Sequence, residues 1–226
     1  MSGRRLGDSL PCGRICRGLR VADWTVAALF ERPLARSGSP SAECGRLAED
    51  LVATTLGVGG AEVRVAALQP TGRPVARVAG REAGPSVSVA HVRGLIGVAV
   101  CTAGHVGLDI VHPADAGPAL DAFFTLAELA VMPDDLGLAR PLLWAAKEAA
   151  FKAARLDVGF RPRQFEIEEL SPDGFSWRVR GRTPVVAGAG RFFTVARHVV
   201  ALAATSAAGV RAGYGAPARL EAMACS

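Results

Sequence analysis

The sequence predicts an α+β protein built from two similar subdomains that meet in a cleft. Each half of the chain contains a helical segment and several short segments in which polar and apolar residues alternate, as in strands with one buried face. Half of the 226 residues are hydrophobic, so each half has enough apolar side chains for a core. We therefore expect an N-terminal subdomain over residues 1–105 and a C-terminal subdomain over residues 106–226.

The N-terminal subdomain has one predicted helix and three predicted strands. Its first forty residues are rich in Arg, Gly, Ser and Pro around one apolar patch, Val26–Phe30, and the sequence leaves their order open. A helix is expected over Ala42–Leu56, because its apolar residues fall on one side and Gly57 ends it. The predicted strands are Val63–Leu68, Ser86–His91 and the apolar run Leu95–Cys101, and Pro70–Pro74 is a predicted turn.

The C-terminal subdomain begins with a predicted strand over Val106–Val111, which follows a turn at Thr102–His105. Helical patterns come next. The stronger of two predicted helices runs from Pro141 to Leu156, because it opens with proline, is rich in alanine and contains no glycine. The weaker helix is Ala119–Val131, and the strands that complete the subdomain are Gln164–Glu168, Phe175–Val179 and Phe192–Ala203.

The composition favours some classes of protein and excludes others. A net charge of +5 and an isoelectric point near 9.3 favour an acidic partner, either a phosphorylated ligand or an acidic protein. Aromatic residues are few and no nucleic-acid-binding motif accompanies the charge, so we expect no nucleic-acid partner. No apolar run is long enough for a membrane span. Five cysteines, an odd number, without a secretory signature indicate reduced thiols and a cytoplasmic protein.

Lysine is rare in this chain and confined to one place. Of 26 basic residues only Lys147 and Lys152 are lysines, and Glu148 lies between them in the stretch Trp144–Lys152. A compact ammonium suits a single phosphate oxygen, whereas guanidinium is a broad planar fork, so lysine here indicates a specific use. The alternative is drift in an arginine-rich composition, with Glu148 and Lys152 forming an ordinary surface ion pair.

Two acidic residues could hold a metal ion. On a helix, Glu148 shares one face with Trp144 and Lys152. Glutamate suits Mg²⁺, which takes one or two protein carboxylates and leaves its other positions to phosphates and waters. Asp109 is the candidate second ligand, because a carboxylate in the apolar strand Val106–Val111 is costly unless it is paired or bound to a metal. The alternative for Asp109 is a hydrogen bond to a turn near the strand end.

Four elements, taken in order, carry a resemblance to a known family. Two are weak alone: His91 has the ordinary interpretation of a structural hydrogen-bonding histidine, and Arg73 that of a solvated turn residue. In this order and spacing they resemble the 4′-phosphopantetheinyl transferase superfamily, over Thr71 to about Glu168. The chain length resembles the Sfp type, in which one chain holds two similar halves. The elements are Gly72-Arg73-Pro74, Ser86-Val-Ser-Val-Ala-His91, Gly107-Leu-Asp109-Ile110 and Trp144-Ala-Ala-Lys147-Glu148-Ala-Ala-Phe-Lys152.

The resemblance implies an activity. Members of the superfamily move the phosphopantetheine arm of coenzyme A to a serine hydroxyl of an acyl or peptidyl carrier protein and release adenosine 3′,5′-bisphosphate. Such carriers belong to fatty acid, polyketide and nonribosomal peptide biosynthesis. The implied protein is a Mg²⁺-dependent monomer whose active site lies in the cleft between halves related by a pseudo-twofold axis.

The resemblance also implies site residues. Asp109 and Glu148 are the expected Mg²⁺ ligands, and Glu148 is the expected base for the serine proton, directly or through a water. Lys147 and Lys152 are expected to contact phosphate, and Lys152 is the better candidate for stabilising the transition state. The residues expected to bind coenzyme A are Arg46, Arg73, His91, Lys147 and Lys152.

A carrier-docking region is also implied. The segment Asp157–Phe165 resembles the docking region of the family. Because carrier proteins are acidic, Arg161 and Arg163 are expected to steer the carrier electrostatically, alongside the apolar Phe160. The alternative for both arginines is a solvated loop.

Two positions depart from the family pattern. The Sfp type has a second acid two residues after the aspartate, and this chain has Val111 there, on the side of the strand that carries Asp109. The smaller AcpS type uses two carboxylates, so we expect a water in the third position. Ala90 stands where many relatives have serine. The missing acid motivates an alternative, a catalytically weakened homologue that binds carrier or coenzyme A without turnover; a basic nucleic-acid-binding module is supported by charge alone.

Overall fold

The computed structural model describes residues 15–22, 25–31, 40–80, 84–130, 138–171, 174–195 and 197–205. These residues form two compact units, one that includes the described residues up to Ala103 and one that begins at Gly104. Both units contain helices and antiparallel sheets, so the predicted α+β class is confirmed. Among the described residues, no helix combines the length and the apolar character that crossing a membrane requires.

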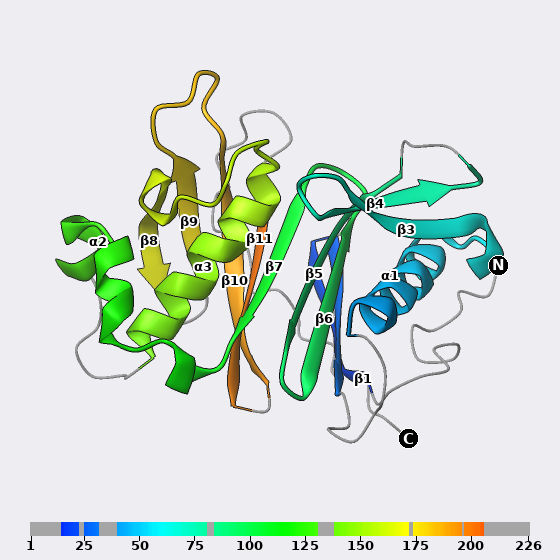
Figure 1. The fold of residues 1–226 in the computed structure, drawn as a ribbon, viewed down its shortest axis with the longest axis horizontal. Helices are drawn as coiled ribbons and strands as arrows, with labels where there is room; N and C mark the ends of the chain where they lie inside the picture. The colour runs from blue at the N-terminus through cyan, green and yellow to red at the C-terminus, as the bar shows by residue number, and fades with distance from the viewer. Residues whose placement is uncertain are drawn as a thin grey trace. The chain divides into compact units, whose positions relative to one another are not determined.

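The first unit is a six-stranded antiparallel sheet with one helix, α1 (Pro40–Leu56). The helix packs against the sheet (Figure 1). Its residues Leu47, Leu51 and Val52 are buried in the core of this unit, as the periodicity predicts. The strands lie in the order β1-β2-β6-β5-β4-β3. Their bounds are Ile15–Ala22 (β1), Thr25–Glu31 (β2), Val63–Leu68 (β3), Arg73–Val78 (β4), Ser86–Val92 (β5) and Leu95–Cys101 (β6).

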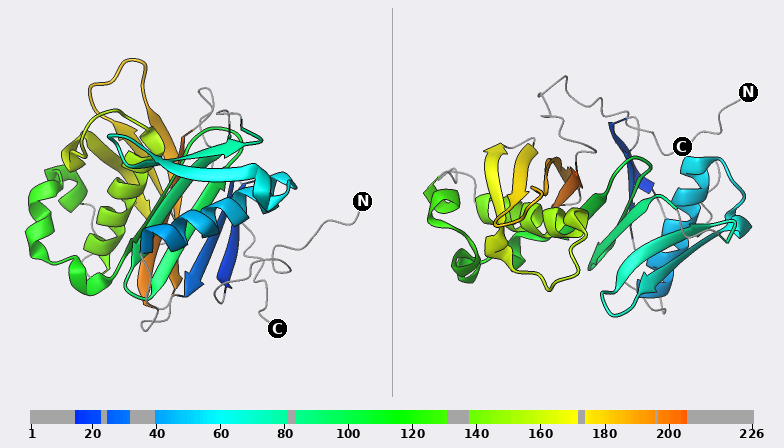
Figure 2. Two further views of the ribbon diagram at one scale, coloured as in Figure 1. Left: turned by 45° about the vertical axis from the view of Figure 1, so that its right-hand side comes forward. Right: turned by 90° about the horizontal axis from the view of Figure 1, so that it is seen from above.

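The second unit is a five-stranded antiparallel sheet whose strands lie in the order β7-β11-β10-β9-β8. Helix α3 (Ala139–Ala154) packs on one face of this sheet, and the shorter α2 (Leu126–Ala130) precedes it (Figures 1 and 2). Short 3₁₀ turns occupy Pro113–Asp115 (η2), Pro118–Phe123 (η3) and Pro162–Gln164 (η4). The strands are Val106–Val111 (β7), Phe165–Ser171 (β8), Gly174–Val179 (β9), Ala187–Val195 (β10) and His198–Thr205 (β11).

The two units share one topology. In each, a strand is followed by a long helix and then by four antiparallel strands, and the last of these four pairs with the first strand. The closing pair is β2 with β6 in the first unit and β7 with β11 in the second. The first unit adds β1 at its edge, and the second adds α2 before its long helix. The two halves are therefore alike in the order of their elements, although the sequence shows no internal repeat.

Several elements differ from the sequence predictions. The patch Val26–Phe30 is part of an ordered strand, β2, which pairs with β1 and β6. A further strand, β4, begins inside the predicted turn at Arg73. The predicted helix over Ala119–Val131 is divided into η3 and α2, because Phe124 is extended, with φ −98° and ψ 154°. The predicted strand over Phe192–Ala203 is two strands of a hairpin, since the chain reverses at Arg197, where φ is 66°.

Two glycines make room for the aromatic core of the second unit. Gly188 pairs with Trp177 across the sheet, and Gly190 pairs with Phe175. A Cβ at Gly188 would lie 2.8 Å from the Trp177 ring, and one at Gly190 would lie 2.1 Å from the Phe175 ring. Both aromatic side chains are fully buried against the residues of α3. The glycines are therefore strand residues that aromatic rings cover, not loop residues.

Candidate active site

Strand β7 and helix α3 touch at the level of their backbones. The contact is possible because residue 107 is glycine: a Cβ there would lie 1.9 Å from the Ala149 carbonyl oxygen and 2.9 Å from the Lys152 Cβ. The helix face that meets the sheet is made of fully buried alanines, among them Ala149 and Ala153. This close approach brings a side chain that follows Gly107 on the same side of β7 directly against α3.

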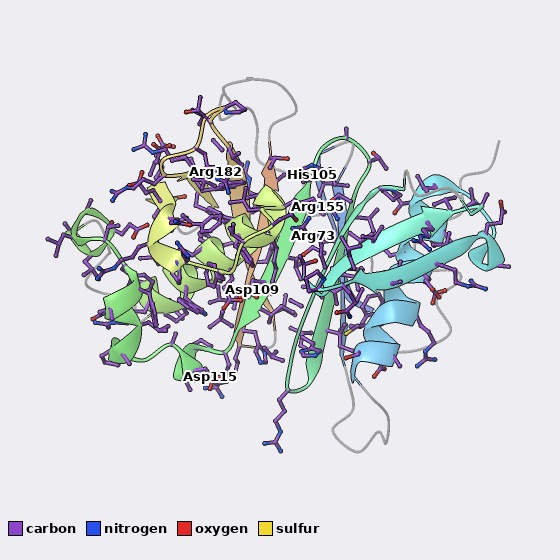
Figure 3. The ribbon with its side chains drawn as sticks, turned by 45° about the horizontal axis from the view of Figure 1, so that its top comes forward. Arg73, His105, Asp109, Asp115, Arg155 and Arg182 are labelled. Atoms are coloured by element: carbon purple, nitrogen blue, oxygen red, sulfur yellow. The ribbon has the colours of Figure 1, made fainter. Side chains whose placement is uncertain are left out.

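Asp109 is that side chain (Figure 3). It lies in the middle of β7, is buried, and accepts a hydrogen bond from Lys152 Nζ at 2.7 Å. The same ammonium donates to the Leu108 carbonyl oxygen at 3.0 Å and lies 3.9 Å from Glu148 Oε2. The nearest acidic partner of Lys152 is therefore Asp109 on β7, and not Glu148 on its own helix. An ordinary surface ion pair between Glu148 and Lys152 does not account for this arrangement. The turn interpretation of Asp109 also fails, because its side-chain partners, Lys152 and Glu148, lie on α3.

The two carboxyl groups interact directly with each other. Burial, the charge of Asp109 and a hydrogen bond between the two groups raise the pKa of Glu148 to about 7. Burial likewise raises the pKa of Asp109, against the opposing effect of Lys152. The Trp144 side chain, one turn earlier on α3, donates a hydrogen bond to Glu148 and acts in the opposite direction on its pKa. The pair thus favours a proton or a cation between its oxygens.

These residues form a compact acidic site with one flexible cation. In the described part of the chain, no group of three or more His, Cys, Asp and Glu side chains is arranged to hold a metal ion. Two carboxylates are nevertheless within the number of protein ligands that Mg²⁺ commonly takes. Val111, which stands where the Sfp type has a second acid, is buried in the apolar core that includes α3. The donor set at Asp109 and Glu148 therefore fits a divalent ion that takes its other ligands from substrate and water.

Lys147 points away from this site. Its side chain has no exposed surface, and its ammonium donates to Glu128 Oε1 at 2.6 Å, the Phe165 carbonyl oxygen at 2.6 Å and the Pro162 carbonyl oxygen at 3.1 Å. Burial lowers the pKa of Lys147, and Glu128 acts against that shift. The predicted contact with a phosphate does not fit this placement, because the ammonium would have to leave three protein acceptors to reach a ligand.

Glu128 is the residue that sequence reasoning missed. It is buried, accepts from Lys147 and from the Ile167 amide at 2.9 Å, and forms reciprocal hydrogen bonds with Thr125. The signal in the sequence was Thr125-Leu-Ala-Glu128, a pattern that commonly begins a helix with such a reciprocal pair. It lay inside the segment predicted to be one continuous helix, so the start of α2 was not recognised.

The predicted docking residues lie in η4 and directly before it. Phe160 is half-buried and its ring lies 5.7 Å from that of Trp144 and 5.0 Å from that of Phe151, centroid to centroid. Arg161 and Arg163 are exposed. An aromatic cluster thus continues from the residue that contacts Glu148 to the segment with the two arginines. Contact of this segment with a carrier stays a prediction.

The remaining predicted residues lie in the first unit. Arg46 is an exposed residue of α1, Arg73 begins β4 and is half-buried, and His91 is exposed on β5. Ala90, beside His91, is buried. Binding of coenzyme A by Arg46, Arg73 and His91 stays a prediction.

A comparison with known protein families agrees with this site. The site is formed where β7 contacts α3, by Gly107, Asp109, Glu148 and Lys152. Residues 105–203 match the family model of the 4′-phosphopantetheinyl transferase superfamily. The matched range contains all four of these residues and lies within the second unit. A search of curated proteins found no match.

Replacing Gly107 tests the backbone contact on which the site is built. Gly107→Ala should lower the free energy of unfolding by about 1–3 kcal/mol, because the added methyl overlaps backbone atoms that cannot move independently. Urea denaturation followed by circular dichroism measures the change. Gly117→Ala is the matched control, since its Cβ would meet nothing within 4 Å. Equal stability of the two variants would show that α3 can move away from β7 without cost.

Proposed function

We propose that the protein is a Mg²⁺-dependent 4′-phosphopantetheinyl transferase of the Sfp type. It transfers the phosphopantetheine arm of coenzyme A to a serine hydroxyl of an acyl or peptidyl carrier protein and releases adenosine 3′,5′-bisphosphate. The observation that carries the proposal is the pair of interacting carboxyl groups, Asp109 and Glu148, with the Lys152 ammonium beside them. The superfamily match over the same residues supports it.

Asp109 and Glu148 would hold the metal. Mg²⁺ bound there would neutralise charge on the pyrophosphate oxygens of coenzyme A. The set of residues fits this ion because both groups are oxygen ligands, Asp109 is buried and Glu148 is partly buried, and the charge of Asp109 raises the pKa of Glu148. With only two acids present, the ion would take its other ligands from substrate and water.

Two side chains would carry out the rest of the reaction, Glu148 as the base and Lys152 as the cation. Glu148, whose pKa is raised to about 7, is suited to accept the serine proton near neutral pH, directly or through a water. The serine oxygen then forms a bond to phosphorus as the bond between phosphorus and the departing adenosine bisphosphate breaks. Lys152 can turn its ammonium from Asp109 to the phosphate oxygens, where charge accumulates.

Further parts of the proposal concern the partners. Arg46, Arg73 and His91 would bind coenzyme A, and Phe160, Arg161 and Arg163 would dock the acidic carrier. The two halves would be similar in fold, and the protein would be a cytoplasmic monomer. The shared topology of the two units supports the similarity of the halves.

Intact mass spectrometry tests the proposal directly. After incubation of the protein with coenzyme A, Mg²⁺ and an apo carrier protein, the carrier should gain the mass of one phosphopantetheine group. Serine-to-alanine substitution in the carrier should prevent the gain. The absence of any gain on acyl and peptidyl carriers would favour the alternative, a weakened homologue that binds without turnover, which Val111 in the place of an acid motivates.

Mg²⁺ binding should depend on pH through Glu148. Its pKa is raised in the folded protein, so the metal-free fold is favoured at low pH and loses that stabilisation as pH rises through about 7. Mg²⁺ competes with the proton, so it should raise the melting temperature more at pH 8 than at pH 6. Differential scanning fluorimetry with and without Mg²⁺ measures both effects. The same shift at both pH values, or an unchanged pH dependence in Glu148→Gln, would contradict the assignment.

A further inference from the structure

A buried ion pair joins four elements of the second unit behind the acidic site. Lys147 lies on α3 and Glu128 on α2, and both side chains are almost completely buried. Lys147 Nζ reaches the carbonyl oxygen of Pro162 in η4 and that of Phe165 at the start of β8. Glu128 Oε1 accepts from the Ile167 amide in β8. The segment that follows α3 is therefore attached, through one ammonium, to the turn of α3 that carries Glu148.

The chemistry of this network indicates that the Lys147–Glu128 pair positions the elements around it. It does not indicate that the pair adds to the stability of the fold. The ammonium has three donors and three acceptors within hydrogen-bond distance, so its donors are fully used. Burying two charges is costly, and well-packed apolar residues of similar size often serve stability as well or better. In some proteins a buried polar pair instead selects one arrangement of the elements that it joins. The planar fork of arginine could not donate to the same three acceptors.

The arrangement that it selects is that of the carrier-docking segment. Pro162 lies between Arg161 and Arg163, the two exposed arginines, so a bond to the Pro162 carbonyl oxygen fixes the backbone from which both project. The residues between α3 and η4 include no helix or strand. The packing of Phe160 also holds this stretch, as do two backbone hydrogen bonds at η4, from the Gln164 amide to the Arg161 carbonyl oxygen and from the Arg180 amide to the Gln164 carbonyl oxygen.

We propose that Lys147 and Glu128 are positioning residues that hold the Arg161–Arg163 segment in place for the carrier protein. The inference rests on the proposed function, because it names the part of the chain that receives the acceptor substrate. Neither residue touches substrate. Their effect is on carrier binding, and the site formed by Asp109, Glu148 and Lys152 keeps its geometry, since β7 and α3 remain in contact at Gly107.

Steady-state kinetics with a matched control tests the proposal. Glu128→Gln keeps the size of the side chain and removes its charge, and Lys147→Met removes the ammonium. Each should raise the KM for the apo carrier about tenfold, while kcat and the KM for coenzyme A change less than about twofold. Asp121→Asn is the control. Asp121 forms a partly buried ion pair with Arg140, 2.7 Å long, that also joins the region before α2 to α3 but does not reach η4. It should leave both KM values unchanged.

A purely structural role predicts a different pattern, which would overturn the proposal. A partly unfolded variant would show a lower apparent kcat with both KM values unchanged, because fewer molecules would be active. If neither variant folds, Thr125→Ala carries the same test more gently, since it removes only the hydroxyl that accepts from the Glu128 amide at 3.2 Å.

Hydrogen exchange followed by mass spectrometry gives a readout that does not depend on activity. Peptides that cover residues 157–164 should exchange faster in Glu128→Gln than in the unsubstituted protein, and should not change in Asp121→Asn. Equal exchange in all three proteins would overturn the inference even if the transferase reaction is found. If instead the unsubstituted protein transfers nothing, the proposed function fails while the exchange result still decides whether the ion pair holds this segment.

Discussion

Glu148→Gln is expected to lower kcat for phosphopantetheine transfer by about 10²- to 10⁴-fold, the range over which a positioned acid or base usually contributes. The amide keeps the shape of the side chain and its contact with Trp144, but it cannot take a proton and is a poor ligand for Mg²⁺. The rate is measured as the appearance of holo carrier by intact mass at saturating substrates.

The loss should come without unfolding. Burial makes the Glu148 carboxylate costly in the metal-free fold, so the amide should leave the melting temperature at pH 8 unchanged or raise it. Glu168→Gln is a suitable control, because Glu168 is an exposed acid on β8 whose partner is Arg178, at 3.2 Å. Activity of Glu148→Gln close to that of the control would remove Glu148 from the mechanism.

Lys152→Ala should have two effects of opposite sign. It should lower kcat about 10²-fold or more, because a cation aimed at developing charge is lost. It should also tighten the binding of Mg²⁺ in the absence of coenzyme A, because the ammonium that lies 2.7 Å from Asp109 no longer competes with the metal. Isothermal titration calorimetry measures the second effect without any turnover.

Lys152→Arg separates charge from shape. The guanidinium keeps the positive charge, but its planar fork is larger than the ammonium that fits between Asp109 and the Leu108 carbonyl oxygen. We expect partial rescue of kcat. Full activity would show that any cation is sufficient at this position, and weaker Mg²⁺ binding in Lys152→Ala than in the unsubstituted protein would show that the lysine does not occupy the place of the metal.

Much of the fold could be predicted because local signals agreed with the final structure. The apolar run of β6, the alternation of β5 and the alanine-rich α3 needed no knowledge of distant contacts. Strand β10 was only partly recognised, because Ala187-Gly-Ala-Gly190 resembles a loop until the rings of Phe175 and Trp177 are known to lie over it. Strand β2 was similarly dependent on its partner β6, 64 or more residues away in the chain.

The candidate site was predictable in part for the same reason. Glu148 and Lys152 are one turn apart, and Asp109 is conspicuous as an acid in an apolar strand. Lys147 looks equally available in the sequence, but its direction depends on where α2, η4 and β8 pack around α3. A sequence pattern reveals which helix face a residue shares, and not which neighbours cover that face.

The alanine face of α3 has a consequence for mutational surveys. Ala145, Ala146, Ala149, Ala150 and Ala153 are completely covered. Gly107 leaves no space opposite Ala149 and Ala153. Any larger side chain there would lift the helix and widen the separation between Glu148 and Asp109. A survey of activity should therefore find sharp intolerance at positions that carry no functional group. The separation of Glu148 from Asp109 therefore depends on small side chains, the alanines of α3 and Gly107. A search limited to polar residues would overlook these positions.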